Sequence, residues 1–405
     1  MLRGGQGMPE KKKRRKLDED KCLNQDNMAD ETNPSPENEK SLSPESKEQK
    51  SVTPDKSYNE KIKQITSKWM EGSGAEAEIV ISSRIRLARN ISGFPFPPLA
   101  SDEHREKVLS MGKKVLQEQK DYLSDMNLLD ISSFSAVYRQ VLVEKHLISP
   151  LQARESLSSA LILRDDEVVS IMINEEDHFR IQCLLPGLQL KKGWEEASRY
   201  DDYLEQVVDY AFHQDLGYLT ACPTNVGTGL RASVMLYLPA LVITGQINHI
   251  LSAISQVGLA VRGIYGEGTE MVGGLCQVSN QITLGQSEEE IWQNLYSVIR
   301  HLINQERKAR QHLLNKERDK LADRAGRAYG ILKHARLLNA EETMQFISDV
   351  RLGVDLGLLG DVPVGTLNEL LVLTQPGCLQ YLKGKSLSPY ERDLERATRV
   401  KQYLP

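Results

Sequence analysis

Arginines recur in short segments that the sequence pattern predicts as strands or strand ends. The segment Ser82–Arg86 (SSRIR) places Arg84 and Arg86 two positions apart, so both side chains point to the same face if the backbone is extended. Planar guanidinium groups bind phosphate through paired hydrogen bonds. The spacing therefore favours a polyphosphate site, although this motif alone leaves open the alternative of a solvated strand edge.

An acidic cluster follows the apolar segment 168–173. Asn174–Arg180 (NEEDHFR) brings three carboxylates, an imidazole and a guanidinium together at the end of a predicted strand. Neighbouring carboxylates raise one another's pKa, and a carboxylate with a raised pKa is a suitable general base. The alternative is an acidic turn, which explains the acidic run but not its position or Arg180.

Two further segments combine glycine with reactive or charged side chains. In Cys222–Arg231 (CPTNVGTGLR), the loop brings backbone N–H groups close to an anion and favours a thiolate at Cys222; a buried, inert cysteine is the alternative. Arg262–Glu270 (RGIYGEGTE) is flexible enough to close over a substrate, with Glu270 at its end. Its alternative is a plain hairpin loop.

Alternating strands and helices are expected to position these residues. Strands are predicted at 137–144, 168–174, 233–239 and 258–264. Helices are predicted from Ser149-Pro150 onward, at 195–215 and 246–255, after Ser287 with its capping partner Glu290, and after Asn339 with Glu342. The pattern indicates an α+β catalytic domain over 57–320 and a helical domain over 325–405.

Composition narrows the class of protein. The 405 residues have a net charge of -5, which lies outside the first 56 residues because these carry equal numbers of basic and acidic side chains. That segment is rich in Pro, Ser, Asn, Glu and Lys, so we expect a disordered tail. We expect a cytoplasmic protein, because the chain lacks a membrane-spanning segment and a signal peptide. Five scattered cysteines without a CxxC pair argue against disulfides and structural zinc.

Several common functional classes lack their motifs. Neither a GxxxxGK[ST] loop nor an HRD and DFG pair is present, so any phosphoryl transfer uses another scaffold. The basic run Lys11–Lys16 is followed at once by Asp18–Asp20 and has no interleaved aromatic residue. This pattern is more typical of a solvated charge cluster than of a nucleic-acid site, so a nucleic-acid partner is not expected.

The ordered motifs together resemble the phosphagen (guanidino) kinase family, and most closely its bacterial branch of protein-arginine kinases. The matching segments are SSRIR at 82–86, EKHLISP at 144–150, NEEDHFR at 174–180, CPTNVGT at 222–228 and RASVM at 231–235. The resemblance implies a curved antiparallel sheet flanked by helices, as in glutamine synthetase. It also implies ATP-dependent phosphorylation of arginine in proteins, with Mg²⁺ held largely by phosphates and water.

The resemblance implies particular site residues. The nucleotide site comprises Ser82, Ser83, Arg84, Ile85, Arg86, His146, Arg180, Arg231, Ala232, Ser233, Val234, Met235, Arg262, Gly263, Ile264, Tyr265, Gly266 and Glu267. Glu176 matches the catalytic base, with Glu175 as the neighbour left open. Cys222 matches a reactive cysteine beside the guanidinium, and Glu270 matches a second carboxylate that binds the substrate. No protein ligands for a metal are implied.

The C-terminal part carries one more motif of this branch. Arg392, Asp393, Arg396 and Ala397 match an RDxxRA pattern that binds phosphoarginine allosterically, and a charged solvated helix is the alternative. Tyr265 and Gly268 depart from kinases of free guanidino compounds, which remain the alternative function. The resemblance further implies a homodimer, protein substrates with exposed arginine, an activator protein, and partners in heat-shock regulation and proteolysis.

Overall fold

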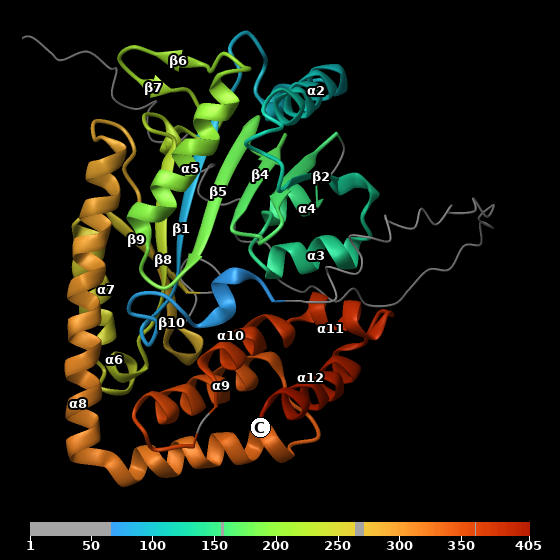
Figure 1. Cartoon of the computed structure of the whole chain (residues 1–405). Coiled ribbons are helices and arrows are strands. Elements are labelled where there is room, and N and C mark those ends of the chain that lie inside the picture. Colours follow the sequence, from blue (N-terminus) through green and yellow to red (C-terminus); the bar gives the residue numbers. More distant parts are fainter. Residues whose placement is uncertain (1–65, 155–157, 264–270, 361) are drawn as a thin grey trace, which may run out of the picture.

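An eight-stranded antiparallel sheet forms the centre of the molecule. The computed structural model describes residues 66–154, 158–263, 271–360 and 362–405, and the expected tail lies outside these ranges. The strand order is β2-β3-β4-β5-β1-β8-β10-β9 (Figure 1). The strands are β1 (Val80–Arg89), β2 (Met126–Asp130), β3 (Ala160–Arg164), β4 (Val169–Ile173), β5 (Phe179–Pro186), β8 (Leu230–Tyr237), β9 (Leu259–Gly263) and β10 (Leu275–Asn280). A separate hairpin pairs β6 (Phe212–His213) with β7 (Gly217–Tyr218).

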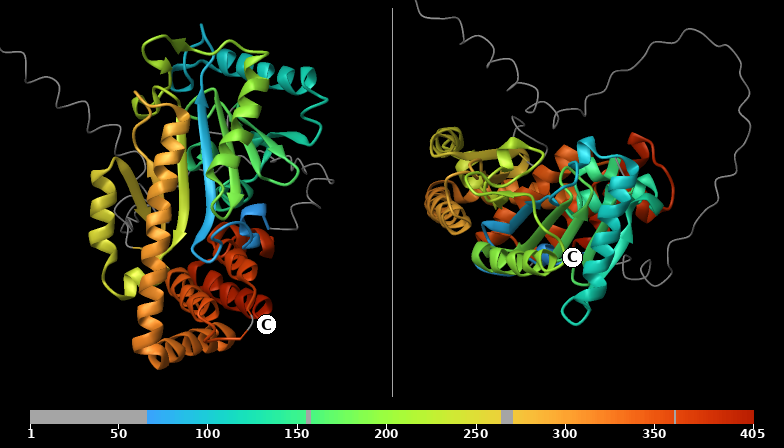
Figure 2. Two further views of the ribbon diagram at one scale, coloured as in Figure 1. Left: turned by 60° about the vertical axis from the view of Figure 1, so that its left-hand side comes forward. Right: turned by 90° about the horizontal axis from the view of Figure 1, so that it is seen from above.

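Helices cover one face of this sheet (Figure 2). Gly193 in α5 (Leu190–Glu205) lies against Ile85, so that a Cβ there would be 3.2 Å from Ile85 Cγ1. Gly112 in α2 (Asp102–Glu118) similarly lies against Ile173 of β4. Ile85 and Ile173 are therefore buried beneath helices, and the residues that alternate with Ile85 on β1, such as Arg84 and Arg86, point to the other face.

The remaining helices complete the molecule. They are α3 (Ala136–Glu144), α4 (Pro150–Arg154), α6 (Pro239–Ile243), α7 (Ile247–Gln256), α8 (Glu288–His334), α9 (Ala340–Asp355), α10 (Val364–Leu373), α11 (Pro376–Lys383) and α12 (Pro389–Tyr403), with 3-10 turns η1 (Lys68–Glu71), η2 (Pro97–Leu99), η3 (Ile131–Ser133), η4 (Pro223–Asn225) and η5 (Val272–Gly274). In the described ranges, no helix is long and apolar enough to cross a membrane.

Helix α8 connects the sheet to the C-terminal helices. It runs beside the sheet and then turns beneath it (Figure 1), with a non-helical backbone conformation at Glu317 (φ -136°, ψ 30°). The predicted boundary at 320–325 falls inside this helix. The division into domains over 57–320 and 325–405 therefore stays a prediction.

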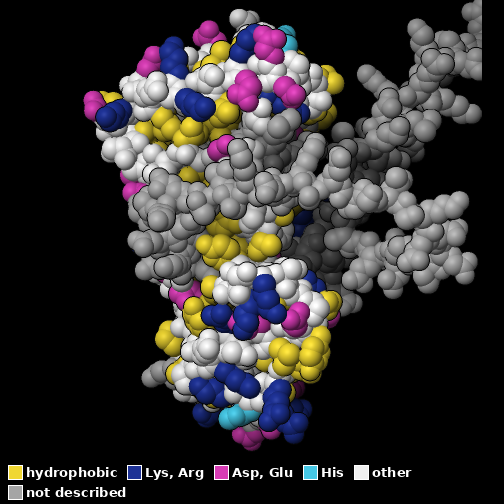
Figure 3. All heavy atoms as spheres, turned by 90° about the vertical axis from the view of Figure 1, so that its right-hand side faces the viewer, with side chains coloured by type: hydrophobic (Ala, Val, Ile, Leu, Met, Phe, Trp, Pro, Cys, Tyr) yellow, Lys and Arg dark blue, Asp and Glu magenta, His cyan; other side chains and the backbone are white. Residues whose placement is uncertain are grey.

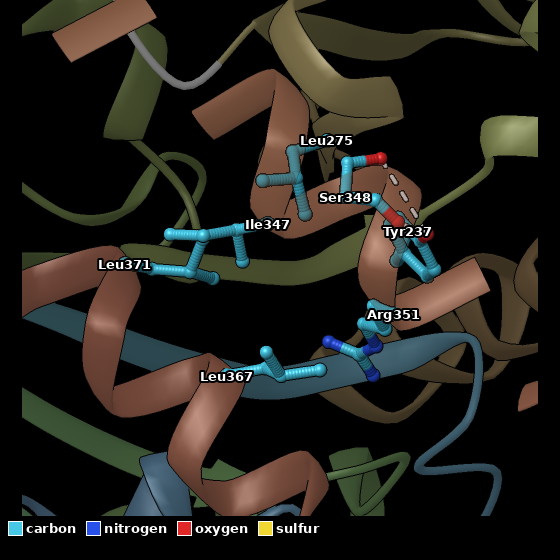
Figure 4. A pocket seen from close by; sticks show the side chains of 7 residues that line it. All are labelled: Tyr237, Leu275, Ile347, Ser348, Arg351, Leu367 and Leu371. Carbon is cyan, nitrogen blue, oxygen red and sulfur yellow. Dashed lines mark hydrogen bonds between the residues drawn. The ribbon is translucent and has the colours of Figure 1, made fainter. Parts of the chain in front are cut away.

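The C-terminal helices pack against the end of the sheet (Figure 4). The Tyr237 hydroxyl, at the end of β8, donates to the backbone oxygen of Ser348 in α9. Arg351 lies over the Tyr237 ring at 4.7 Å and donates to the backbone oxygen of Ala77. The end of β8 and the segment just before β1 are thereby joined to α9.

The predicted α+β fold with an antiparallel sheet is confirmed. The strand predicted at 137–144 is wrong, because this segment forms α3. The Ser135 hydroxyl accepts from Tyr138 N at 3.2 Å and caps the helix. The buried residues Tyr138, Val141 and Leu142 have helical spacing, which the loose alternation concealed.

The helix predicted at 195–215 is also corrected at both ends. Helix α5 starts at Leu190 and ends at Glu205, and part of the remainder forms β6. Other predicted elements are confirmed. The strand predicted at 168–174 is β4, and the Ser149 hydroxyl accepts from Gln152 N at 3.0 Å at the start of α4. Helix α8 begins with the predicted capping box of Ser287 and Glu290.

Candidate functional site

Five arginines share the face of the sheet opposite α2 and α5, here called the open face. They are Arg84 and Arg86 on β1, Arg180 on β5, Arg231 on β8 and Arg262 on β9. The strand register produces this arrangement, because Arg86 lies opposite Arg231 and residues two positions along a strand point to the same side. Ala88 lies opposite Arg180, which places Arg180 on the same side.

The other expected nucleotide residues divide between the two faces. Ser82, Ser233 and Met235 alternate with the arginines on the open face, whereas Ser83, Ile85, Ala232 and Val234 point to the helix-covered face. The Ser83 hydroxyl donates to Gly187 O and accepts from Gln189 N, so it fastens the start of α5. Gly263 ends β9, and Ile264, Tyr265, Gly266, Glu267, Gly268 and Glu270 lie outside the described residues.

The arginine face strongly favours an anion. Burial, together with the positive charges of Arg180, Arg231 and Arg262, lowers the pKa of Arg84 to about 9. Burial and the same neighbourhood lower the pKa of Arg86 well below its usual value. A phosphate chain would neutralise this mutual repulsion, so the residues fit a polyphosphate substrate.

Polar side chains of β8 and β10 orient the Arg84 guanidinium group. Arg84 Nη2 donates to Gln277 Oε1 at 3.1 Å, and Arg84 Nε lies 3.4 Å from Ser233 Oγ. Arg86 Nε is buried and has no hydrogen-bond partner in the described part of the chain. This unused donor is a second observation in favour of a ligand on the open face.

His146 is placed beside the arginine face. It adopts a left-handed backbone conformation (φ 61°), and its backbone oxygen accepts from Gln182 Nε2 at 2.7 Å. Its ring lies 5.4 Å from the Trp69 ring. Burial, with a contribution from Arg84, lowers the pKa of His146 to about 3, so its imidazole is neutral and can pack against another ring.

The acidic turn distinguishes its two glutamates. Both Glu175 oxygens accept from Arg180 Nη1 at 2.7 Å. Burial alone would raise the pKa of Glu175, but Arg180 and hydrogen bonds hold it below its usual value. Burial and the charges of Glu175 and Asp177 raise the pKa of Glu176 to about 7. Of the two glutamates, Glu176 is therefore the one whose pKa is raised toward neutral pH.

Cys222 lies across from this turn at the start of η4. It is half-buried, and its Sγ lies 3.0 Å from Thr224 Oγ1. The preceding Ala221 N donates to Asp177 Oδ1 at 2.7 Å. Loop and acidic turn therefore meet, and the structure brings Cys222 and Glu176 to the same end of the arginine face.

Several residues of this site were not singled out from the sequence. Gln277 and Ser279 of β10 border Arg84 and Arg231. Their signal was the alternation of apolar and polar side chains from Cys276 to Ser279. Asn90 joins the acidic turn to the loop before Cys222 through Asp177, and no local sequence signal reveals that contact.

The C-terminal motif lies on α12, where Arg392 is half-buried. Arg396 is only 2% exposed and donates to Thr374 O, Leu338 O and Asp393 Oδ1 at 2.9, 2.7 and 2.5 Å. Asp393 therefore pairs with Arg396 in the same helix. Ala397 is buried beside them. Three acceptors within the protein thus hold Arg396, and phosphoarginine binding by this motif stays a prediction.

Among the described residues, no group of three or more His, Cys, Asp or Glu side chains is placed to hold a metal ion.

Known proteins share this architecture. The family ATP:guanido phosphotransferase, C-terminal catalytic domain, matches residues 107–309, and the Protein-arginine kinase McsB C-terminal domain matches residues 318–405. A protein-arginine kinase of Desulforamulus reducens is 51% identical over 353 residues, covering 86% of this chain and 98% of that protein. One from Moorella thermoacetica is 53% identical over 340 residues, covering 84% and 97%.

A solved structure agrees with these sequence matches. The crystal structure of lombricine kinase superimposes with a TM-score of 0.51 at 28% identity, covering 58% of this chain and 68% of that one. Sequence relatives and the fold thus lead to one assignment. The chain belongs to the ATP:guanido phosphotransferase family, in its group of protein-arginine kinases.

Proposed function

We propose that this protein transfers the terminal phosphoryl group of ATP to arginine side chains of other proteins. The observation that carries the proposal is the face of five arginines that adjoins Glu176, the carboxylate whose pKa is about 7. Arginines bind and neutralise phosphates, and phosphoryl transfer depends chiefly on positioning and charge neutralisation. Relatives named protein-arginine kinase support a protein-bound acceptor.

ATP is proposed to lie with its phosphates on Arg84, Arg86, Arg180, Arg231 and Arg262. His146 and Trp69, at the edge of this face, offer ring surface to the base. Mg²⁺ bound with ATP would neutralise part of the phosphate charge. The phosphates and water would hold the metal, consistent with a face built of cationic donors.

The pKa of the acceptor guanidinium exceeds about 12, so the group is protonated at neutral pH. It must lose a proton before its nitrogen can act as a nucleophile. The attacking nitrogen forms the N–P bond while the bond between the terminal phosphorus and the bridging oxygen breaks, and ADP leaves. Glu176 is proposed to take the proton released from the nitrogen. Glu175 is held by Arg180 through both oxygens, so we assign it to positioning Arg180 rather than to proton transfer.

Cys222 is proposed to contact the acceptor guanidinium opposite Glu176. Sulfur and carboxylate would then flank the same planar cation and orient its attacking nitrogen toward the phosphate. Glu270, outside the described residues, remains a proposed second carboxylate for the substrate.

The decisive experiment incubates the protein with ATP, Mg²⁺ and an unfolded arginine-rich protein. Mass spectrometry under non-acidic conditions should detect acid-labile phosphate on arginine. Labelling of free arginine alone would instead support a kinase of a small guanidino compound, the alternative favoured by the fold match to lombricine kinase.

Regulation and partners complete the proposal. We propose that α12 binds phosphoarginine through Arg392, while Arg396 and Asp393 shape the helix from within. Lys and Arg side chains gather over the C-terminal helices, with acidic side chains among them (Figure 3). An Arg392→Ala variant should lose phosphoarginine binding measured by calorimetry but keep catalysis on a peptide. A homodimer, an activator protein, heat-shock and proteolysis partners and a cytoplasmic location remain predictions.

A further inference from the structure

Asn90 connects the two loops that face the acceptor. It follows β1 directly and is 1% exposed. Its Nδ2 donates to Asp177 Oδ1 at 2.6 Å and to Leu219 O at 3.1 Å, and its Oδ1 accepts from His178 N at 2.9 Å. One amide side chain thus bonds to the acidic turn twice and to the segment before Cys222 once.

Asp177 closes the connection. Its Oδ1 also accepts from Ala221 N at 2.7 Å, so a single oxygen receives hydrogen bonds from Asn90 and from the residue before Cys222. Asp177 is 1% exposed and follows Glu176 directly. Displacement of this oxygen would move Glu176 and Cys222 relative to each other.

The next residue fixes the turn from its other side. His178 Nδ1 accepts from Ile91 N at 3.0 Å, and its Nε2 lies 3.1 Å from Pro95 O, which identifies Nε2 as the protonated nitrogen. Burial lowers the pKa of His178 to about 4, so this neutral tautomer persists at physiological pH. The turn is therefore held to residues 90–95 by side chains of both Asn90 and His178.

We propose that Asn90 is a positioning residue for catalysis, which fixes the Glu176 turn against the Cys222 loop through Asp177. The inference rests on the proposed roles of Glu176 and Cys222. Two groups that must flank one planar guanidinium need a fixed separation, and a misplacement of about 1 Å can reduce the rate about 10²-fold. The ATP-binding arginines have separate supports, such as Gln277 for Arg84.

The test compares Asn90→Ala, Asp177→Ala and the double variant with Asn127→Ala as a matched control. Asn127 also uses its Nδ2 for two contacts, with Leu163 O and Asp165 Oδ1, but lies at the sheet edge on β2. We expect Asn90→Ala to lower kcat about 10- to 100-fold on an arginine peptide. The Kd for ATP, measured by equilibrium binding, should stay within about twofold because the arginine face is untouched. The control should change neither.

The double variant should be no slower than the slower single variant, because both substitutions break one bridge. Additive losses, a parallel rise in the Kd for ATP, or an Asn90→Ala enzyme with unchanged kcat would overturn the proposal. If Asn90→Ala does not fold, Asp177→Asn decides the question. It keeps an acceptor oxygen and should retain far more kcat than Asp177→Ala, whereas equal losses would contradict positioning. A wild-type enzyme that phosphorylates no arginine would refute the proposed function instead.

Discussion

Two groups of arginines in this molecule have opposite surroundings. On the sheet, Arg84 and Arg86 face other arginines, and burial with this repulsion lowers the pKa of both. Beneath the sheet, Arg310 of α8 donates to Glu306 at 2.8 Å, Asp355 at 3.1 Å and Glu78 O at 3.1 Å. Burial alone would lower the pKa of Arg310, but these carboxylates raise it.

The presence or absence of carboxylate partners distinguishes two classes of arginine. The first class fits an anionic ligand, and the second class stabilises the fold. A buried cation without a carboxylate is costly, and the cost is tolerable where a bound anion removes it. A cation whose acceptors all belong to the protein has no such need. Arg396 likewise donates to acceptors that belong to the protein. The comparison thus assigns a role from hydrogen-bond partners rather than from residue type.

Glu176→Gln should break the catalytic region most severely. Without a proton acceptor, kcat should fall about 10²- to 10⁴-fold. The measurement is the rate of phosphoryl transfer from ATP to an arginine peptide. In the wild type, kcat/KM should fall as pH decreases through about 7, because Glu176 must be ionised.

The stability of the same variant checks that its fold is intact. The pKa of Glu176 is raised in the folded state, so its favourable contribution is present at low pH and is lost as pH rises through about 7. Glu176→Gln should therefore raise Tm more at pH 8 than at pH 5. Full activity of this variant would refute the assignment of the base.

Arg310→Ala should instead lower the free energy of unfolding. It leaves Glu306, which is 0% exposed, without its cationic partner, and loss of one member of a buried ion pair costs about 3–5 kcal/mol. Urea unfolding measures this loss. The kcat per folded molecule should stay unchanged at low temperature. An unchanged urea midpoint would contradict the assignment of Arg310 to the class that stabilises the fold.

Arg86→Ala should show the converse. We expect kcat to fall about 10²- to 10³-fold, while Tm stays unchanged or rises because repulsion from Arg84 and Arg180 is relieved. Thermal unfolding and steady-state kinetics together measure both effects. A large fall in Tm with retained activity would place Arg86 in the structural class.

Arg324→Ala should have the smallest effect on the free energy of unfolding and provides a reference for the larger losses. Arg324 pairs with Asp349 at 2.9 Å, but its side chain is 44% exposed. Such pairs contribute about 0–1 kcal/mol. A loss as large as that of Arg310→Ala would show that pairing rather than burial sets the cost.

Much of the fold was predictable because its signals are local. Ser287 with Glu290 marks the start of α8, since a capping box is contained in four residues. The prediction for segment 137–144 was wrong because its apolar residues are compatible with the periods of both a strand and a helix. The cap at Ser135 and burial of one side of the segment favour the helix. The close packing at Gly112 and Gly193 could not be predicted from the sequence, because these glycines contact strands that are distant in sequence.

The sequence by itself determined which chemistry was available and that Arg84 and Arg86 share a face, because alternation along a strand is a local property. It also determined that Glu175 and Glu176 are adjacent. Only the tertiary structure decided that Glu175 pairs with Arg180 and that Arg396 is enclosed. The alignment of Arg86 with Arg231 likewise depends on register, since a slip of one residue would turn an arginine to the opposite face. Such pairings depend on packing between distant segments, which no local pattern encodes.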